Sequence, residues 1–210
     1  MNQSEIRRSS DGLNWETVYQ QGFGSSREGL TGIAWSGSEF LVTAGEGPLL
    51  TSTDGSQWVE AGRVGDWFAS GVRWLNDQWM VHENTHVAIR CDAVTWLTVT
   101  PGPENEGFGS LDRHPQHGYR LVGINHVYQS QDGLVWTRVE GAPALIELVA
   151  GAEGFLGRAR SMIYSSPDGI TWVPEFSANL PADIFHDGNQ FVVVEPRSVL
   201  NVCDAMVPTP

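Results

Sequence analysis

One short segment of the sequence has the residue types and spacing of a zinc site. His82, Glu83 and His86 stand in the order His-Glu-x-x-His. On a helix this spacing brings both imidazoles to one face, where they bind zinc with the carboxylate beside the metal. Here the segment lies between Gln78–Val81 and Val87–Arg90, which both have the composition of strands. We therefore predict a turn between two strands with solvated histidines, and we expect neither a metal nor a cofactor.

Composition excludes several other kinds of chemistry. All 12 basic residues are arginine, and the absence of lysine excludes Schiff-base chemistry and lysine general bases. A net charge of −13 opposes binding to phosphate backbones, so we expect no nucleic-acid partner. No apolar run approaches the roughly 18 residues of a membrane span. Because residues 1–10 lack the apolar core of a signal peptide, we expect a cytoplasmic protein or a piece of a longer exported chain.

The elements that position any site follow from an internal repeat, Asp-Gly-x-x-Trp with Ala in place of Gly in the third copy. The copies begin at Asp11, Asp54, Asp92, Asp132 and Asp168, and they end at Trp15, Trp58, Trp96, Trp136 and Trp172. The Asp positions therefore differ by 43, 38, 40 and 36 residues. A period near 40 residues, with Asp-Gly turns between short extended runs, is typical of four-stranded β-propeller blades.

An aromatic residue opens the second strand of each repeat and gives all repeats one frame. These aromatics are Phe40, Trp79, Tyr119, Phe155 and Phe191. In the first repeat, the predicted strands are Gly32–Ser36, Glu39–Ala44, Leu49–Thr53 and Trp58–Ala61. No segment shows a sustained helical period, so the expected fold is all-β.

Five inner hairpins and five outer hairpins predict a single five-bladed propeller domain over residues 1–210. Its four-stranded antiparallel blades are expected at about 31–61, 70–99, 108–140, 146–176 and 183–204, the last completed by 5–19. The N-terminal outer strands, within Ile6–Tyr19, would pair with the C-terminal inner strands, within Asp183–Glu195, and so close the ring. Ser198–Cys203 is then a surplus strand or a tail. We expect a monomer.

The two cysteines occupy equivalent places in two repeats. Cys91 and Cys203 each directly precede an Asp. Repeats this far apart in a ring do not bring two thiols within disulfide reach. We predict that both are small buried residues.

The fuller pattern Ser-x-Asp-Gly-x-x-Trp resembles the Asp-box, or BNR repeat, of sialidases, sortilin-like receptors and a photosystem assembly factor. It is clear at Ser9–Asp11, Ser52–Asp54, Ser130–Asp132 and Ser166–Asp168, whereas the copy at Asp92 has Arg90 in place of the serine. The resemblance implies that each Asp accepts hydrogen bonds from turn amides and that each Trp packs between neighbouring sheets. It therefore implies a structural role for all five Asp and all five Trp residues.

Ligands of propellers usually bind where variable loops surround the central channel. If the Asp turns line one face of the ring, the turns between second and third strands and the links between blades line the opposite face. The candidate ligand-binding residues there are Glu83, Trp67, Arg158, Arg160, Glu195 and Arg197. Mixed charges and an aromatic side chain suit a polar ligand, which favours a non-catalytic binding propeller for a glycan or a protein.

Two alternatives remain open. A glycoside hydrolase resembling five-bladed arabinanases and invertases would place channel carboxylates at Asp112, Glu147 and Asp183, with Glu83 or Glu195, while a sialidase-like enzyme would need an Arg-Ile-Pro start that is absent. Glycoside hydrolysis requires an acid and a second carboxylate at a defined separation. The other alternative is a structural or assembly scaffold with a flat interaction surface.

Overall fold

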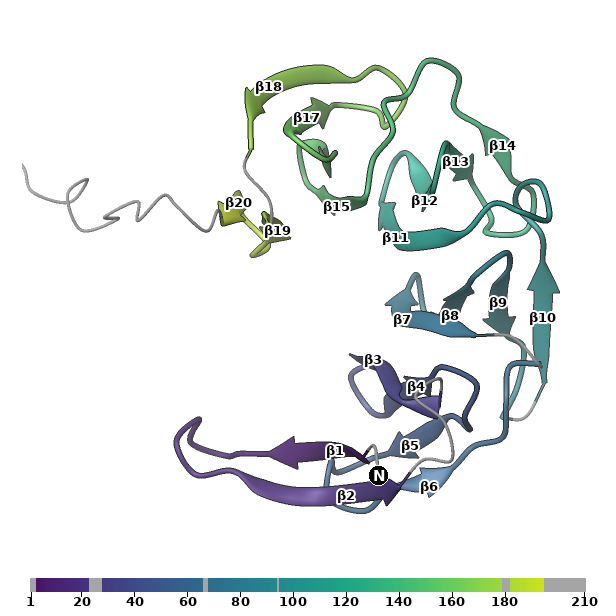
Figure 1. The fold of residues 1–210 in the computed structure, drawn as a ribbon, viewed down its shortest axis with the longest axis vertical. Coiled ribbons are helices and arrows are strands. Elements are labelled where there is room, and N and C mark those ends of the chain that lie inside the picture. The colour runs from purple at the N-terminus through teal and green to yellow at the C-terminus, as the bar shows by residue number, and fades with distance from the viewer. Residues whose placement is uncertain (1–2, 23–27, 66–67, 94, 179–181, 195–210) are drawn as a thin grey trace, which may run out of the picture.

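The computed structural model describes residues 3–22, 28–65, 68–93, 95–178 and 182–194. Within these ranges the chain forms strands β1 to β20 and no α-helix, which confirms the all-β prediction (Figure 1). No helix in this part of the chain is long and apolar enough to cross a membrane.

Four antiparallel sheets of four strands form the middle of the chain. The first comprises β3 (Leu30–Trp35), β4 (Phe40–Ala44), β5 (Leu50–Ser52) and β6 (Val59–Glu60). The second comprises β7 (Ala69–Leu75), β8 (Gln78–Glu83), β9 (Val87–Arg90) and β10 (Trp96–Val99). The third comprises β11 (Phe108–His114), β12 (Gly118–Gly123), β13 (Val127–Ser130) and β14 (Thr137–Arg138). The fourth comprises β15 (Glu147–Gly151), β16 (Gly154–Arg158), β17 (Met162–Ser166) and β18 (Val173–Ser177).

Two further sheets have two strands each. They are β1 (Gln3–Arg8) with β2 (Glu16–Gly22), and β19 (Asp183–His186) with β20 (Phe191–Val194). Together with the four complete sheets they fit the predicted five blades, with β1–β2 as an outer hairpin and β19–β20 as an inner hairpin. The first strands β3, β7, β11, β15 and β19 lie on the concave side of the arrangement (Figure 1).

The Asp turn between the third and fourth strands is built by side chains that bind backbone amides. Oδ1 of Asp54 accepts hydrogen bonds from the N–H groups of Ser56 (2.7 Å) and Gln57 (2.9 Å). Oγ of Ser52 accepts one from Gly55 N–H at 2.8 Å, and Gly55 has a φ of +71°, which L side chains rarely adopt. The same bonds recur at Asp11, Asp132 and Asp168.

The turn at Asp92 uses a different side chain. Arg90 stands where the other repeats have serine, and its guanidinium donates to the backbone oxygens of Asp92 (3.0 Å) and Ala93 (3.1 Å). Arg90 also pairs with Glu39 of the neighbouring sheet at 2.9 Å. This turn is therefore tied to the preceding blade. Cys91 beside it is exposed, so the prediction that it is buried is wrong, and Cys203 lies outside the described residues.

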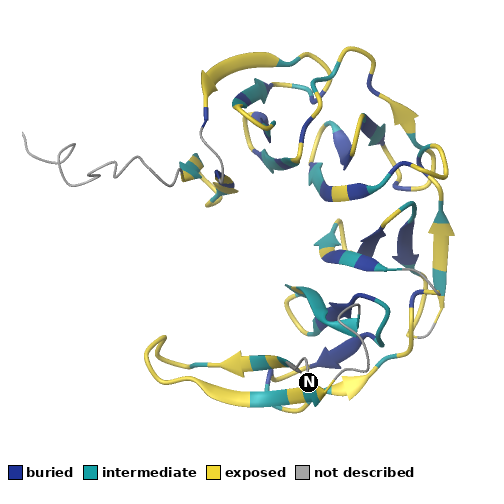
Figure 2. Ribbon diagram, viewed as in Figure 1, coloured by how far each residue is buried: buried dark blue, intermediate teal, exposed yellow. Residues whose placement is uncertain are grey.

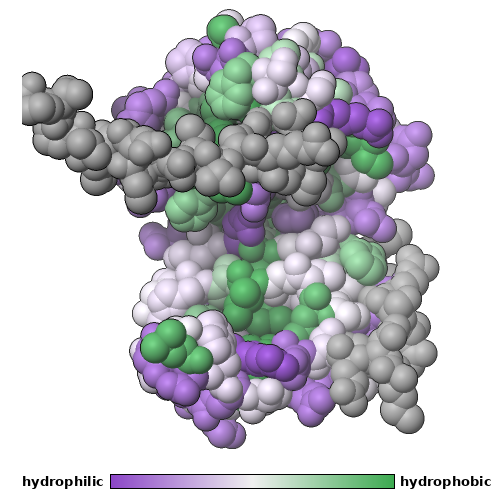
Figure 3. Space-filling model, turned by 60° about the vertical axis from the view of Figure 1, so that its left-hand side comes forward, coloured by the Kyte–Doolittle hydropathy of each residue, from purple (hydrophilic) through white to green (hydrophobic). Residues whose placement is uncertain are grey.

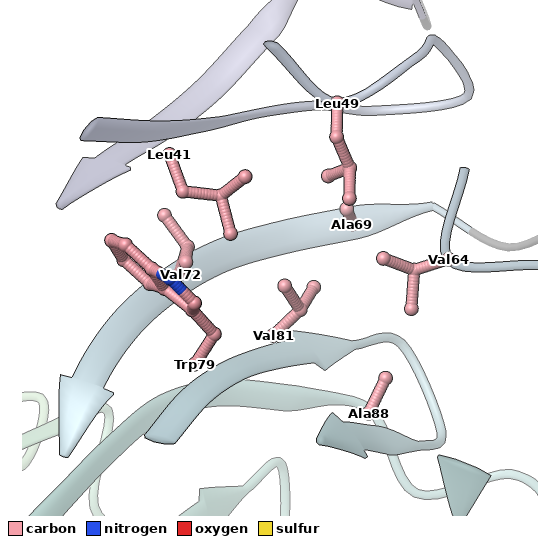
Figure 4. Close-up of a cluster of buried hydrophobic side chains, with 8 residues drawn as sticks. All are labelled: Leu41, Leu49, Val64, Ala69, Val72, Trp79, Val81 and Ala88. Carbon is pink, nitrogen blue, oxygen red and sulfur yellow. The ribbon is translucent and has the colours of Figure 1, made fainter. Parts of the chain in front are cut away.

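Apolar side chains between neighbouring blades form the core. Leu41 and Leu49 of the first blade meet Val72, Trp79 and Val81 of the second (Figure 4). Equivalent clusters join the second blade to the third, the third to the fourth and the fourth to the fifth. The second strands are buried while the outer strands are exposed (Figure 2).

The repeat tryptophans are less buried than expected. Trp96, Trp136 and Trp172 are partly buried and pack against the inter-blade clusters. Trp15, in the outer hairpin at the start of the chain, is 61% exposed, so it is not a core residue in this structure. Trp15 is exposed because its sheet has only two strands, so no inner hairpin of the same sheet covers the indole.

The expected ring closure is not present. Among the described residues, β1–β2 and β19–β20 are separate sheets, and they lie at the two ends of an open arc (Figure 1). The hairpin β1–β2 contacts the first blade instead, because Arg8 donates to Ser56 Oγ and Leu30 N–H donates to Ser4 Oγ. The surplus strand expected at Ser198–Cys203 lies outside the described residues.

The open ends leave blade faces uncovered. Ile33 is 53% exposed, whereas Val72, Leu111, Leu148 and Ile184, which hold the same register in the other blades, are at most 4% exposed. Phe185, Val192 and Val194 of the last hairpin are also exposed. Apolar surface accordingly runs along the wall that faces the opening (Figure 3).

Arg120 gives a test of how blades are joined. It occupies the register position of Leu41 and Met80, and its buried guanidinium donates to the backbone oxygens of His117, Asp168 and Gly169. We predict that Arg120→Ala lowers the free energy of unfolding by about 2–5 kcal/mol, since it leaves a cavity and unpaired carbonyls. Urea denaturation would measure this, and Arg138→Ala at an exposed position should change stability by less than about 0.5 kcal/mol. Equal effects of the two variants would contradict the prediction.

Candidate functional site

Two pockets open on the face opposite the Asp turns. The channel pocket, about 690 Å³, lies where the first strands of successive blades approach one another. Its lining residues are Arg73, Gly109, Ser110, Ile146, Glu147, Arg158, Ala182 and Asp183. The inter-blade pocket, about 700 Å³, lies between the third and fourth blades and shares Gly109 and Ile146 with it. The structure thus provides concave surface on the face that the repeat frame indicated.

The channel pocket is lined by charges of both signs. Glu147 at the start of β15 accepts two hydrogen bonds from Arg158 at the end of β16, from Nε at 3.1 Å and Nη2 at 3.0 Å. The two residues face each other because β15 and β16 pair antiparallel. Arg73 is exposed on β7, and Asp183 is exposed at the start of β19 with no side-chain partner among the described residues. A polar ligand that reached this pocket would meet two guanidinium groups and two carboxylates.

Asp112 does not line the channel pocket. Its Oδ2 accepts a hydrogen bond from Ala150 N–H of the next blade at 2.9 Å, and its Oδ1 accepts one from Arg113 N–H at 2.8 Å. Burial raises the pKa of Asp112, although the two amide hydrogen bonds act in the opposite sense. Of the three carboxylates considered for hydrolysis, the structure brings Glu147 and Asp183 to one pocket and uses Asp112 to join two blades.

Asp112 belongs to a ladder of side chains that bind β15. Ser110 Oγ bonds both the oxygen and the N–H of Leu148, at 3.2 and 3.3 Å. His114 Nε2 lies 3.4 Å from the oxygen of Ala152. Alternate residues of β11 thus contact alternate residues at the edge of the fourth blade and join the two blades.

Glu83 is not at the surface, contrary to the expectation that it contacts a ligand. A turn separates β8 from β9 as predicted, but it comprises only residues 84–86, because β8 extends through His82 and Glu83. His82 is 3% exposed, so the prediction that it is solvated is wrong. Glu83 is 0% exposed, its carboxylate oxygens have no hydrogen-bond partner among the described residues, and burial raises its pKa to about 7. Burial lowers the pKa of His82 to about 4. The described residues contain no group of three or more His, Cys, Asp or Glu side chains arranged for a metal.

Arg160 lines the inter-blade pocket, beside the turn between β16 and β17. Trp67, Glu195 and Arg197, the other expected ligand contacts, lie outside the described residues. Most of the pocket wall is apolar, with Phe108, Val122, Ile124 and Leu145 among its residues. The polar residues of the turns gave no indication of these apolar side chains. The signal was present in Ile124, an aliphatic residue in a turn where the second blade has Asn84.

Comparisons with known proteins identify the fold. No family model matches the sequence, and no curated protein matches it. Among solved structures, a catalytically inactive virginiamycin B lyase from Staphylococcus aureus is 14% identical with a TM-score of 0.74, over 90% of this chain and 70% of that one. YCF48 bound to D1 peptide is 17% identical with a TM-score of 0.61, over 83% and 62% of the two chains. A GH74 enzyme from Niastella koreensis is 14% identical with a TM-score of 0.60, over 77% and 33%.

These neighbours are β-propeller proteins, and identities this low establish the fold alone. The chain spans 62% of the YCF48 structure and about a third of the GH74 structure. The lyase match extends over 90% of this chain and 70% of the lyase chain.

The ladder gives a test of the role of Asp112. We predict that Asp112→Ala lowers the free energy of unfolding by about 2–3 kcal/mol, because it leaves the N–H of Ala150 without a partner. Asp112→Asn keeps one acceptor oxygen and should lose less. Denaturation in urea would measure both variants against Asp183→Ala, an exposed control. A loss no larger than that of the control would show that the ladder does not join the blades.

Glu83 predicts a pH-dependent stability difference. The pKa of Glu83 in the folded protein lies above its value in an unfolded chain. The contribution of Glu83 to the free energy of unfolding is therefore most favourable at low pH, and it is lost as the pH rises through about 7. Glu83→Gln should therefore match the parent at pH 4.5 and exceed it by up to about 3 kcal/mol at pH 8. The lowered pKa of His82 reduces the stability of both proteins at acidic pH. The difference in free energy of unfolding between the variant and the parent therefore isolates the effect of Glu83. A constant difference across this range would contradict the assignment.

Proposed function

We propose that the protein is a non-catalytic binding propeller that recognises a polar segment of a partner protein at the channel pocket. The observation that carries this proposal is the pocket itself, where Arg73, Arg158, Glu147 and Asp183 converge on the face opposite the Asp turns. Polar side chains on rigid strands can form directed hydrogen bonds with little loss of conformational freedom. We also assign the repeats to the Asp-box (BNR) type, on the hydrogen bonds of their Asp turns.

The state of the carboxylates supports binding over glycoside hydrolysis. Hydrolysis needs two carboxyl groups that reach the substrate, one as acid and one as base or nucleophile. Asp112 uses both oxygens for backbone amides, and Glu147 is paired with Arg158. Asp183 is the one candidate among these three that remains open to a ligand. One protein of similar fold, YCF48, is bound to D1 peptide, which supports a protein partner for this propeller.

The proposal predicts that charge at the channel pocket controls peptide binding. A phage-displayed library of random peptides would be selected on the whole protein, and an oligosaccharide array would be probed in parallel. Selected peptides should bind Asp183→Asn and Arg158→Gln at least about tenfold more weakly than the parent, as expected for the loss of one charge-assisted hydrogen bond. Arg138→Gln, on the outer strand β14, is the matched control and should bind unchanged.

Each other outcome counts against the proposal. Peptides that bind all variants equally would place the site elsewhere. Oligosaccharide binding that depends on Arg158, without peptide binding, would show that the ligand is a glycan. Cleavage of an oligosaccharide would establish the hydrolase. Because Arg158 is paired with Glu147, circular dichroism of each variant would separate lost binding from lost folding, and the exposed Asp183 provides a second, independent test.

A further inference from the structure

The inter-blade pocket has a different character from the channel pocket. It is walled by Phe108 and Val122 of the third blade, by Leu145 and Ile146 of the link between blades, and by Met162 and Tyr164 of the fourth blade. Ile124 and Ile146 at its edge are 66% and 41% exposed. Exposed aliphatic side chains beside a cavity of about 700 Å³ are typical of small-molecule sites, which range from about 300 to 1,000 Å³.

Among the residues that the structure describes, a single charged side chain lines this pocket. Arg160 is exposed, and no hydrogen bond or ion pair joins it to another described residue. Arg158, two residues earlier, is paired with Glu147, so the two arginines are in different states. No carboxylate from the described part of the chain lines the inter-blade pocket. Glu106, a buried carboxylate that precedes Gly107 of the lining, accepts hydrogen bonds from the N–H groups of Asn125 and His126.

We infer that the inter-blade pocket binds a small organic carboxylate: an apolar body that fills the space between the two blades and one carboxylate that pairs with Arg160. The apolar wall favours transfer of an aliphatic or aromatic group out of water. The guanidinium provides a planar pair of donors that suits a carboxylate, at an edge where no acidic side chain competes for it. This inference is independent of peptide binding at the channel pocket, since its site and ligand class are different.

The probe is 2-naphthylacetate, with 2-naphthaleneethanol as its neutral counterpart of similar shape. Isothermal titration calorimetry on the whole protein should show that the acid binds more tightly than the alcohol. Arg160→Gln should weaken the acid at least about tenfold and leave the alcohol unchanged, because only the acid has a charge to lose. Arg138→Gln, with an exposed arginine outside the pocket, should leave both unchanged. Ala144→Phe, which fills the pocket from an exposed position, should weaken both ligands.

Several results would overturn the inference. One is equal binding of the acid to Arg160→Gln and to the parent, and another is equal binding of the acid and the alcohol to the parent. Failure of the acid to bind the parent at millimolar concentration would also exclude the site. Should Ala144→Phe fail to fold, Ile124→Ser tests the same wall at an exposed residue, and unchanged binding of both ligands would place them elsewhere. Arg158→Gln separates the two proposals, since it should weaken peptides at the channel pocket and leave the acid at the inter-blade pocket unaffected.

Discussion

The close approach of neighbouring first strands is the constraint on which the rest of the structure depends. A Cβ added at Gly32 of the first blade would lie 3.1 Å from the Cα of Gly71 in the second, so side chains at this level have almost no room. Between the third and fourth blades the same place holds Ser110, which bonds the backbone of Leu148. The blades are therefore joined near the channel by backbone proximity and small polar side chains. Farther out they are joined by apolar clusters, since a sheet must cover its apolar face.

This constraint explains why the functional surface is localised. Blade edges fixed so closely hold the turns and links above them at set distances, and the side chains on those turns then define the pockets. Glu147 and Arg158 face each other because β15 and β16 are in register, and Asp183 joins them because β19 follows at the next position around the arc. The packing of neighbouring blades creates the pocket. The chemistry of the pocket comes from side chains that this packing does not constrain.

The sequence could predict the elements because repeats carry local signals. The Asp-Gly turns and the aromatic at the second strand agree with the structure, and the strand bounds of the first blade agree to within two residues. Each of these features depends on turn chemistry within a few residues. Closure was not predictable, because the angle between blades depends on side-chain packing that spans about 40 residues. Burial of single polar residues was equally hidden: Glu83 at the end of β8 is buried, yet Asn84, the next residue, is exposed. Polar motifs in a sequence do not indicate which residues form an apolar pocket wall.

The distribution of charge links the fold to recognition. The chain has a net charge of −13, so its surface as a whole repels anions. Yet the two adjoining pockets contain three arginines, Arg73, Arg158 and Arg160, against two carboxylates, Glu147 and Asp183. An anionic group approaching this face meets the attraction of a local excess of guanidinium groups, and elsewhere it meets repulsion. Because exposed charges are screened beyond about 8 Å at physiological salt, the local arrangement outweighs the net charge once a ligand reaches the pockets. A negative net charge of the protein is therefore compatible with anion binding at the two pockets. Together these properties favour binding of an anion at this face over the rest of the surface.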